Sequence, residues 1–167
     1  MRILLAVLIV FAGLAVAADF GAASYAEKAA SETMRNTANL GSDPHVDIQG
    51  FPVLLQAATG KYSKIVVKAD QVGNEKFGLV DVEATLEGVE IPLTDLSDRV
   101  LHKLPVDHLE TTARFSALRP LALVDVAGLL PFGVTPTSVR MDGTTIVVTG
   151  SGDNILIDID ELKGKKS

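Results

Sequence analysis

The chain has no cysteine and no tryptophan among its 167 residues. The first absence excludes a disulfide framework, a thiolate metal site and a lipid-modified N-terminal cysteine. Stability must therefore come from packing, and a chain of this length is long enough for one domain with a substantial core. Because aromatic residues make up only 5% of the chain, the walls of any apolar pocket are expected to be aliphatic. Such walls suit acyl chains better than flat rings.

Basic residues are also scarce, since 15 lysines and arginines face 21 aspartates and glutamates and the net charge is −6. A chain with this balance has no positive field to attract nucleic acid or to hold the folded body on an anionic bilayer. Nucleic acid is therefore not expected as a partner.

The sequence motifs of common catalytic sites are missing as well. There is no Gly-x-Ser-x-Gly nucleophile motif and no glycine-rich phosphate loop. The histidines His45, His102 and His108 lack metal-ligand spacing, and the acidic residues near the C-terminus do not form a calcium loop. We therefore predict a binding protein rather than an enzyme, with no catalytic residues, no metal and no cofactor.

The N-terminal segment from Ile3 to Ala18 carries no charge and follows a single basic residue. As a helix it reaches about 24 Å, short of the roughly 30 Å of a bilayer core, which favours a signal peptide. Small residues at its end fit a cleavage site. An uncleaved anchor stays open, because apolar residues after Asp19 can prolong the helix. Residues 1–18 are thus predicted to be a signal peptide or membrane anchor, and residues 19–167 a single exported domain in the periplasm or cell envelope.

Residues Asp19 to Leu40 favour a helix that ends before the following glycine and proline. Residues at helical spacing gather on one face, namely Phe20, Ala23, Glu27, Ala30 and Met34. We predict that this face packs on a sheet. A stalk that holds the body near the bilayer is the alternative.

The segment 46–62 predicts a strand that bends into an apolar turn. Apolar and polar residues alternate at its start, and Gly50 and Pro52 then break the strand around Phe51. A short apolar segment at 54–58 follows and ends at a glycine. The ring of Phe51 is predicted to be buried at the bend.

Alternation of apolar and polar residues predicts further strands at 62–69, 79–87 and 108–116. Lys64 and Lys68 on the first of these are placed to pair with the acidic row of the second. Residues 89–93 are expected to form an edge strand or a strand end, because a proline there cannot donate to a ladder. Residues 95–106 are expected to form a polar connection or a short helix.

Residues 120–132 carry a single charge and are apolar nearly all round, with proline at the start and glycine near the end, as in a short helix. This helix is predicted either to fill the core or to form a cavity wall or membrane-contacting lip. At the C-terminus, Asp142-Gly143 predicts a type I′ hairpin turn. A second turn at 150–153 makes three antiparallel strands of residues 139–160.

The run Val46-x-Ile48-x-Gly50-Phe51-Pro52-x-Leu54-x-Gln56, followed by Gly60-x-Tyr62, resembles the opening of the LmeA-like phospholipid-binding proteins, an actinobacterial cell-envelope family. The similarity extends more loosely over the segments 79–92 and 139–159. It implies a half-tube related to tubular lipid-binding (TULIP, BPI-like) domains, in which a bent sheet wraps a long helix around an acyl-chain channel.

We therefore predict an α+β fold with a long N-terminal helix packed on a curved antiparallel sheet. The predicted function is binding of a phospholipid or related envelope lipid, for carriage or presentation at a membrane surface. The alternative is a membrane-anchored accessory protein that supports an envelope glycolipid- or lipoglycan-synthesising enzyme, such as a glycosyltransferase, without carrying lipid. The residues predicted to line or gate one apolar, lipid-binding cavity are Phe51, Leu54, Leu55, Leu86, Leu121, Val124, Leu129 and Phe132.

Overall fold

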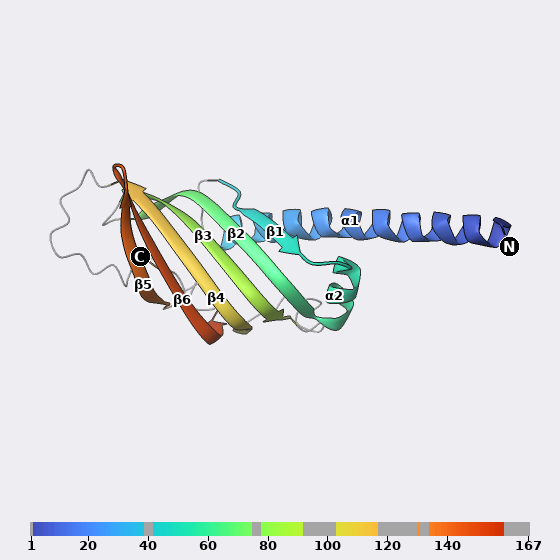
Figure 1. The fold of residues 1–167 in the computed structure, drawn as a ribbon. Helices are drawn as coiled ribbons and strands as arrows, with labels where there is room; N and C mark the ends of the chain where they lie inside the picture. The colour runs from blue at the N-terminus through green and yellow to red at the C-terminus, as the bar shows by residue number, and fades with distance from the viewer. Residues whose placement is uncertain are drawn as a thin grey trace.

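The described residues form two helices and a six-stranded antiparallel sheet (Figure 1). The computed structural model describes residues 2–38, 42–74, 78–91, 103–116, 130 and 134–158. The elements are α1 (Arg2–Ala38), β1 (His45–Gln49), α2 (Val53–Thr59), β2 (Lys61–Asn74), β3 (Gly78–Glu90), β4 (Lys103–Ser116), β5 (Thr135–Asp142) and β6 (Thr145–Asp158). The strand order is β1-β2-β3-β4-β6-β5. This open, twisted sheet with its N-terminal helix confirms the predicted α+β class and is consistent with a half-tube.

The helix α1 is continuous from Arg2 to Ala38, and its N-terminal half projects past the sheet (Figure 1). In its C-terminal half the predicted inner face is largely correct, since Ala23, Glu27, Ala30 and Met34 are half-buried. The prediction that Phe20 belongs to this inner face is wrong, because its side chain is 65% exposed. Among the described residues no helix is both long enough and apolar enough to cross a bilayer.

The two polar contacts of α1 explain why Phe20 faces solvent although Glu27 is half-buried. Glu27 Oε1 accepts a hydrogen bond from Ile48 N on β1, and the Asp19 carboxylate accepts two from Val53 N and Leu54 N at the start of α2. Asp19 and Glu27 are eight residues apart and therefore about 80° apart around the helix, so different sides of α1 contact β1 and α2. At Asp19 the inner side is the one that meets α2, and the next residue points about 100° away from it.

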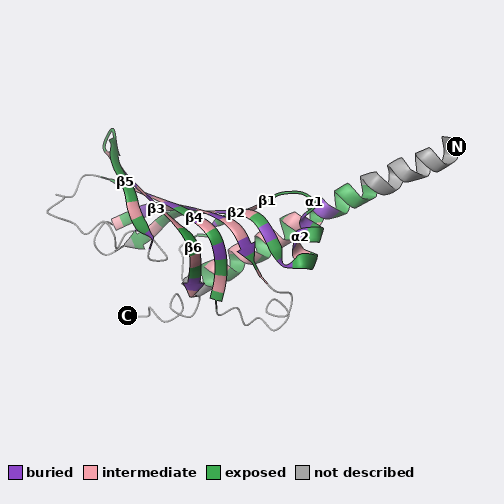
Figure 2. Cartoon of the chain, turned by 60° about the horizontal axis from the view of Figure 1, so that its bottom comes forward, coloured by how far each residue is buried: buried purple, intermediate pink, exposed green. Residues whose placement is uncertain are grey.

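Strand pairing places apolar residues in rows across one face of the sheet. One row runs Ile48, Ile65, Leu86 and Leu109 on β1, β2, β3 and β4, each opposite its neighbour. Further rows carry Val46, Val67, Ala84 and Thr111, then Ala69, Val82, Ala113 and Val148, and then Val80, Phe115, Ile146 and Met141. Figure 2 shows the resulting alternation of burial along the strands. Leu109 and Val148 are fully buried at the centre of this apolar face.

The opposite face of the sheet is polar and carries ion pairs between neighbouring strands. Lys64 Nζ lies 3.2 Å from Glu87 Oε1, and Lys68 Nζ lies 3.2 Å from Glu83 Oε1. Lys61 Nζ is 2.9 Å from Glu90 Oε1 at the end of the same two strands. The predicted pairing of the β2 lysines with the acidic row of β3 is confirmed.

Several strand boundaries differ from the prediction. β3 continues through Gly88 to Glu90 in the middle of the sheet, so of the two predicted alternatives the strand end is correct and the edge strand is wrong. β4 starts at Lys103 rather than after the predicted polar connection. In both cases pairing with distant residues extends the strand, because Val106 lies opposite Val89 on one side and Ile155 on the other. Residues 92–102 lie outside the described residues.

The C-terminal region forms two strands rather than the predicted three. Asp142 pairs with Thr145, so the turn residues are Gly143 and Thr144. Of these two only Gly143 has a positive φ, of 60°, as in type II′ rather than the predicted type I′. The segment 150–153 is not a turn, because β6 runs through it while paired with β4.

Gly150 is required for close approach of the chain rather than for a turn. A methyl group there would collide with Leu130 Cδ1, and would lie 2.7 Å from the Thr135 carbonyl oxygen and 3.1 Å from Val134 Cγ1. We expect Gly150→Ala to lower the free energy of unfolding by about 1–3 kcal/mol through overpacking, measured by chemical denaturation. Gly73→Ala is the matched control, since nothing lies within 4 Å of its added methyl group, and a change below about 1 kcal/mol is expected. Equal effects at both glycines would refute this explanation.

Candidate lipid-binding surface

The bend after β1 is built from Gly50, Phe51 and Pro52, which we call the elbow. Gly50 has a φ of 108° and the Phe51–Pro52 peptide bond is cis. A methyl group on Gly50 would lie 2.9 Å from Gln56 Nε2, so glycine serves here both for its backbone conformation and for the space beside α2. Gly60, with a φ of 69°, ends α2 in the left-handed C-cap conformation.

The helix α2 has no side-chain cap of its own, because its N-cap residue is Pro52. The cap is supplied by α1. Asp19 Oδ2 accepts a hydrogen bond from Val53 N at 2.8 Å, and its Oδ1 accepts one from Leu54 N at 2.6 Å. Only 3% of Asp19 is exposed. A buried carboxylate that satisfies two free N–H groups of a helix start ties α2 to α1.

The burial of α2 does not follow its polarity. Its inward face contains Val53 and the polar Gln56, of which Gln56 Oε1 accepts a hydrogen bond from Ser63 N at 2.8 Å. Its outward face is apolar, with exposed residues at i, i+3, i+4 and i+7. We call these the elbow patch: Phe51 (64% exposed), Leu54 (46%), Leu55 (59%) and Ala58. An apolar helical face turned to solvent is uncommon and marks an interaction surface.

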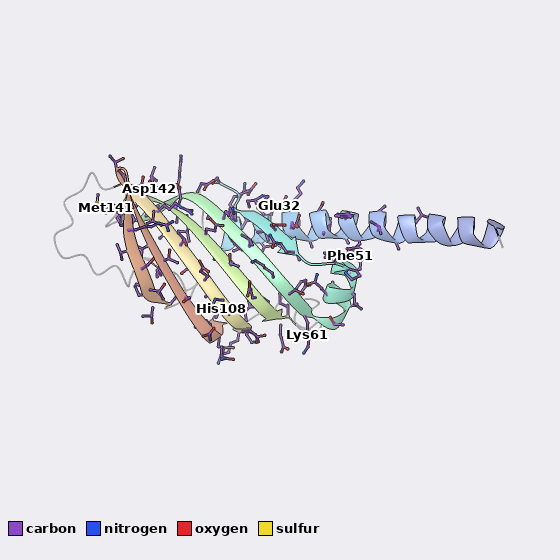
Figure 3. All side chains as sticks on the ribbon, in the orientation of Figure 1. Glu32, Phe51, Lys61, His108, Met141 and Asp142 are labelled. Atoms are coloured by element: carbon purple, nitrogen blue, oxygen red, sulfur yellow. The ribbon has the colours of Figure 1, made fainter. Side chains whose placement is uncertain are left out.

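The structure places the predicted site residues in two different environments. Phe51, Leu54 and Leu55 lie on the elbow patch, so the prediction of a buried Phe51 ring is wrong (Figure 3). Leu86 is 6% exposed and lies in the sheet core opposite Ile65 and Leu109. The other four predicted residues lie outside the described residues, namely Leu121, Val124, Leu129 and Phe132. A cavity shared by all eight stays a prediction.

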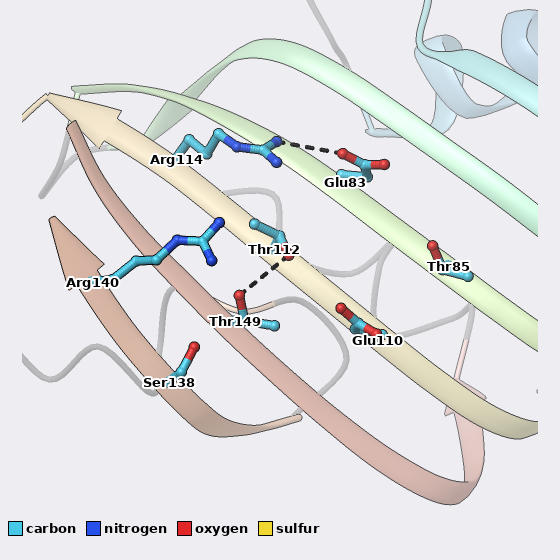
Figure 4. Close-up of a pocket in the computed structure, with 8 residues that line it drawn as sticks. All are labelled: Glu83, Thr85, Glu110, Thr112, Arg114, Ser138, Arg140 and Thr149. Atoms are coloured by element: carbon cyan, nitrogen blue, oxygen red, sulfur yellow. Dashed lines mark hydrogen bonds and ion pairs between the residues drawn. The ribbon is translucent and has the colours of Figure 1, made fainter. Parts of the chain in front are cut away.

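The polar face of the sheet carries a shallow pocket of about 390 Å³ that sequence reasoning missed (Figure 4). Its lining consists of Glu83, Thr85, Glu110, Thr112, Arg114, Ser138, Arg140 and Thr149. These residues belong to four strands, β3 to β6. Alternation alone put the β3 and β4 members on one face, but the registers of β5 and β6 were needed to bring the rest beside them.

Glu83 is the most strongly paired group in this pocket. Its Oε1 is 3.2 Å from Lys68 Nζ, and its Oε2 is 3.4 Å from Arg114 Nη1. Burial raises the pKa of Glu83, but the hydrogen bonds and charges of Lys68 and Arg114 outweigh it, so the pKa is lowered. The carboxylate therefore stays ionised as a structural partner of two cations.

His108 forms an exposed pair with Asp153, its Nδ1 lying 2.6 Å from Oδ1. This hydrogen bond raises the pKa of His108 above the ordinary 6.5, with smaller contributions from other carboxylates. Since the folded pKa is raised, the stabilisation by the pair is present below pH 6.5 and is lost as the pH rises through the folded pKa. We expect Asp153→Asn to lower the His108 pKa in an NMR titration. An unchanged titration midpoint would mean that the pair does not form in solution.

Among the described residues no cluster of three or more histidine, aspartate or glutamate side chains is arranged to hold a metal ion. What the described chain offers is an α+β body with an apolar sheet face, an exposed apolar helix and ion pairs on the polar face. These are the features of a binding domain with an apolar partner.

Comparison with known proteins identifies the family. The model of the LmeA-like phospholipid-binding family matches residues 17–119, and the chain belongs to this family. The match covers the C-terminal half of α1, the elbow, α2 and strands β1 to β4. It does not include the C-terminal hairpin, to which the sequence resemblance had been extended. Neither the curated proteins nor the solved structures gave a match.

Proposed function

We propose that this protein binds a phospholipid or a related envelope lipid through its apolar sheet face and carries it between sites or presents it to membrane enzymes. Membership of a phospholipid-binding family is the observation that carries the proposal. The described surface supports it. Several members of the apolar face remain half-buried rather than buried, among them Ile48, Ile65, Val67 and Val82. Aliphatic side chains that keep some exposed surface are suitable partners for acyl chains.

Native mass spectrometry of the purified full-length protein, followed by lipid extraction, tests this proposal. We expect a lipid at a stoichiometry of about one per chain. The double variant Val67→Thr/Val82→Thr keeps side-chain shape while adding hydroxyl groups to the apolar face, and it should lose lipid while circular dichroism shows a retained fold. Val66→Thr is the matched control, since Val66 lies on the same strand but pairs with Asp47 and Thr85 on the polar face. An empty wild-type protein would contradict the proposal.

The alternative is an accessory protein that supports an envelope glycolipid- or lipoglycan-synthesising enzyme, such as a glycosyltransferase, without carrying lipid. It is separated by the same experiment. An empty protein that co-purifies with such an enzyme would favour the accessory role.

We further propose that the body acts outside the cytoplasmic membrane. The uncharged run from Ile3 to Ala18 and the small residues at its end support export by a signal peptide or an anchor. We expect the body to be found outside the cytoplasmic membrane. Mass measurement of the native protein should then give a chain that starts near Ala18 or Asp19 if the segment is cleaved, and at Met1 if it is kept as an anchor. Recovery of the body in the cytoplasm would contradict export.

A further inference from the structure

The elbow patch itself contains no charged residue. The segment from Gly50 to Gly60 contains no aspartate, glutamate, lysine or arginine. Its buried polar side chain, Gln56, faces inward, while Phe51, Leu54 and Leu55 face solvent. Nothing on this surface offers a charge to a polar partner, so a partner that fits must itself be apolar.

The patch is bonded to a part of α1 that exposes apolar residues and no charge. In the sequence Asp19 interrupts the uncharged residues of the N-terminal helix, but in the fold its carboxylate is buried and bonded to the start of α2. Between Leu14 and Ala26 the described helix surface therefore exposes no charged side chain. It does expose Leu14, Val16, Phe20 and Tyr25 at 61%, 40%, 65% and 78%.

The elbow patch and the projecting half of α1 lie at the same end of the molecule. The elbow and α2 lie at the end of the sheet from which the N-terminal half of α1 projects, and Met141 marks the opposite end (Figures 1 and 3). Two apolar elements, one of them with an uncharged run of residues from Ile3, thus face the same side of the molecule. A planar apolar phase can contact both at once.

We propose that the elbow patch is a membrane-docking surface, which inserts Phe51, Leu54 and Leu55 into the headgroup–acyl boundary of the bilayer that receives the apolar part of α1. The geometry is that of an interfacial helix, whose apolar face enters the boundary region of the bilayer. A bilayer fits better than a protein partner because the described surface of α1 near the patch exposes apolar residues and no charged side chain for specific pairing. Docking is independent of whether the sheet face holds a lipid.

The absence of cysteine allows a direct test with one labelled position. Ala58→Cys in the full-length chain carries an environment-sensitive fluorophore, and the protein is reconstituted with phosphatidylcholine vesicles. Zwitterionic lipid is used because the net charge of −6 gives no attraction to anionic headgroups. The label is read in three backgrounds: wild type, Leu54→Ser/Leu55→Ser, and the control Leu79→Ser. Leu79 is 62% exposed, at least as much as either leucine of the patch, but it lies toward the other end of the sheet and off the apolar sheet face.

In the wild-type and control backgrounds we expect the label to shift to blue emission, to be quenched by spin-labelled lipid and to be shielded from aqueous iodide. In the Leu54→Ser/Leu55→Ser background it should emit as in water and become accessible to iodide, with unchanged thermal unfolding. A label in water in the wild type would overturn the proposal. So would a lipid-buried label in all three backgrounds, because α1 alone would then hold it at the bilayer. A blue shift without vesicles that grows with protein concentration would show that a second copy covers the patch instead.

Discussion

Replacing Phe115 with alanine is expected to lower the free energy of unfolding by about 3–5 kcal/mol, the range for a buried aromatic residue. Phe115 is 4% exposed on β4, where it pairs with Val80 on one side and Ile146 on the other. All three belong to the main hydrophobic cluster. Loss of the ring leaves a cavity that strands held by ladders on both sides cannot easily close. Chemical denaturation monitored by circular dichroism measures the effect.

The same substitution at Phe51 provides the contrast. Its ring is 64% exposed on the elbow patch, so Phe51→Ala should change stability by less than about 1 kcal/mol. The sequence predicted the opposite for this residue. Losses of similar size at Phe51 and Phe115 would mean that the elbow ring is buried in solution, and they would remove it from the proposed docking surface.

Replacing Asp19 with alanine is expected to cost about 2–4 kcal/mol. The carboxylate accepts hydrogen bonds from Val53 N and Leu54 N, and hydrogen bonds to charged groups contribute more than neutral ones. Without it, two N–H groups at the start of α2 lose their partners, and α2 loses a tie to α1. Denaturation gives the total cost, and hydrogen exchange should show faster exchange at Val53 and Leu54 specifically.

The control for Asp19 is a carboxylate in an exposed pair. Asp43 Oδ1 lies 3.2 Å from Arg35 Nε, with side chains 52% and 46% exposed, and such pairs contribute little. Asp43→Ala should therefore stay within about 0.5 kcal/mol of the wild type. If Asp19→Ala were equally mild, with exchange at α2 unchanged, the cap across the two helices would not hold in solution.

Alternation predicted the strands well where one face is apolar and the other charged. On β3 the apolar residues at 80, 82, 84 and 86 point to the core, and Glu83 and Glu87 pair with lysines of β2 on the other face. Period two assigns faces without knowledge of the partner strand. The elbow was predicted for the same reason of local chemistry, because Gly50 and Pro52 can be interpreted without tertiary contacts.

Features that depend on distant contacts were not predictable. The glycines at 150 and 152 read as a turn, yet Gly150 faces Leu130 and Thr135, whose proximity no local pattern encodes. The exposure of Phe51 follows from the way Asp19, more than thirty residues earlier, holds α2. Burial of that carboxylate turned the polar side of α2 inward and left the leucines outside. Half of the predicted lipid-binding residues were located by the structure, and the rest fall outside the described residues.

The hydrogen bond between α1 and β1 also affects the exposed edge of the sheet. Ile48 N on β1 donates to Glu27 Oε1 at 3.0 Å, so part of the outer edge of this strand is already occupied. At the opposite edge, β5 has one neighbour among the described strands. Proline at position 136 removes one donor from β5, and Arg140 sits exposed further along it. Edge strands with free donors invite pairing with other chains, and proline and charge oppose it. The sheet is therefore protected from edge-to-edge pairing with other chains, by a contact with α1 at the β1 edge and by proline and charge at the β5 edge.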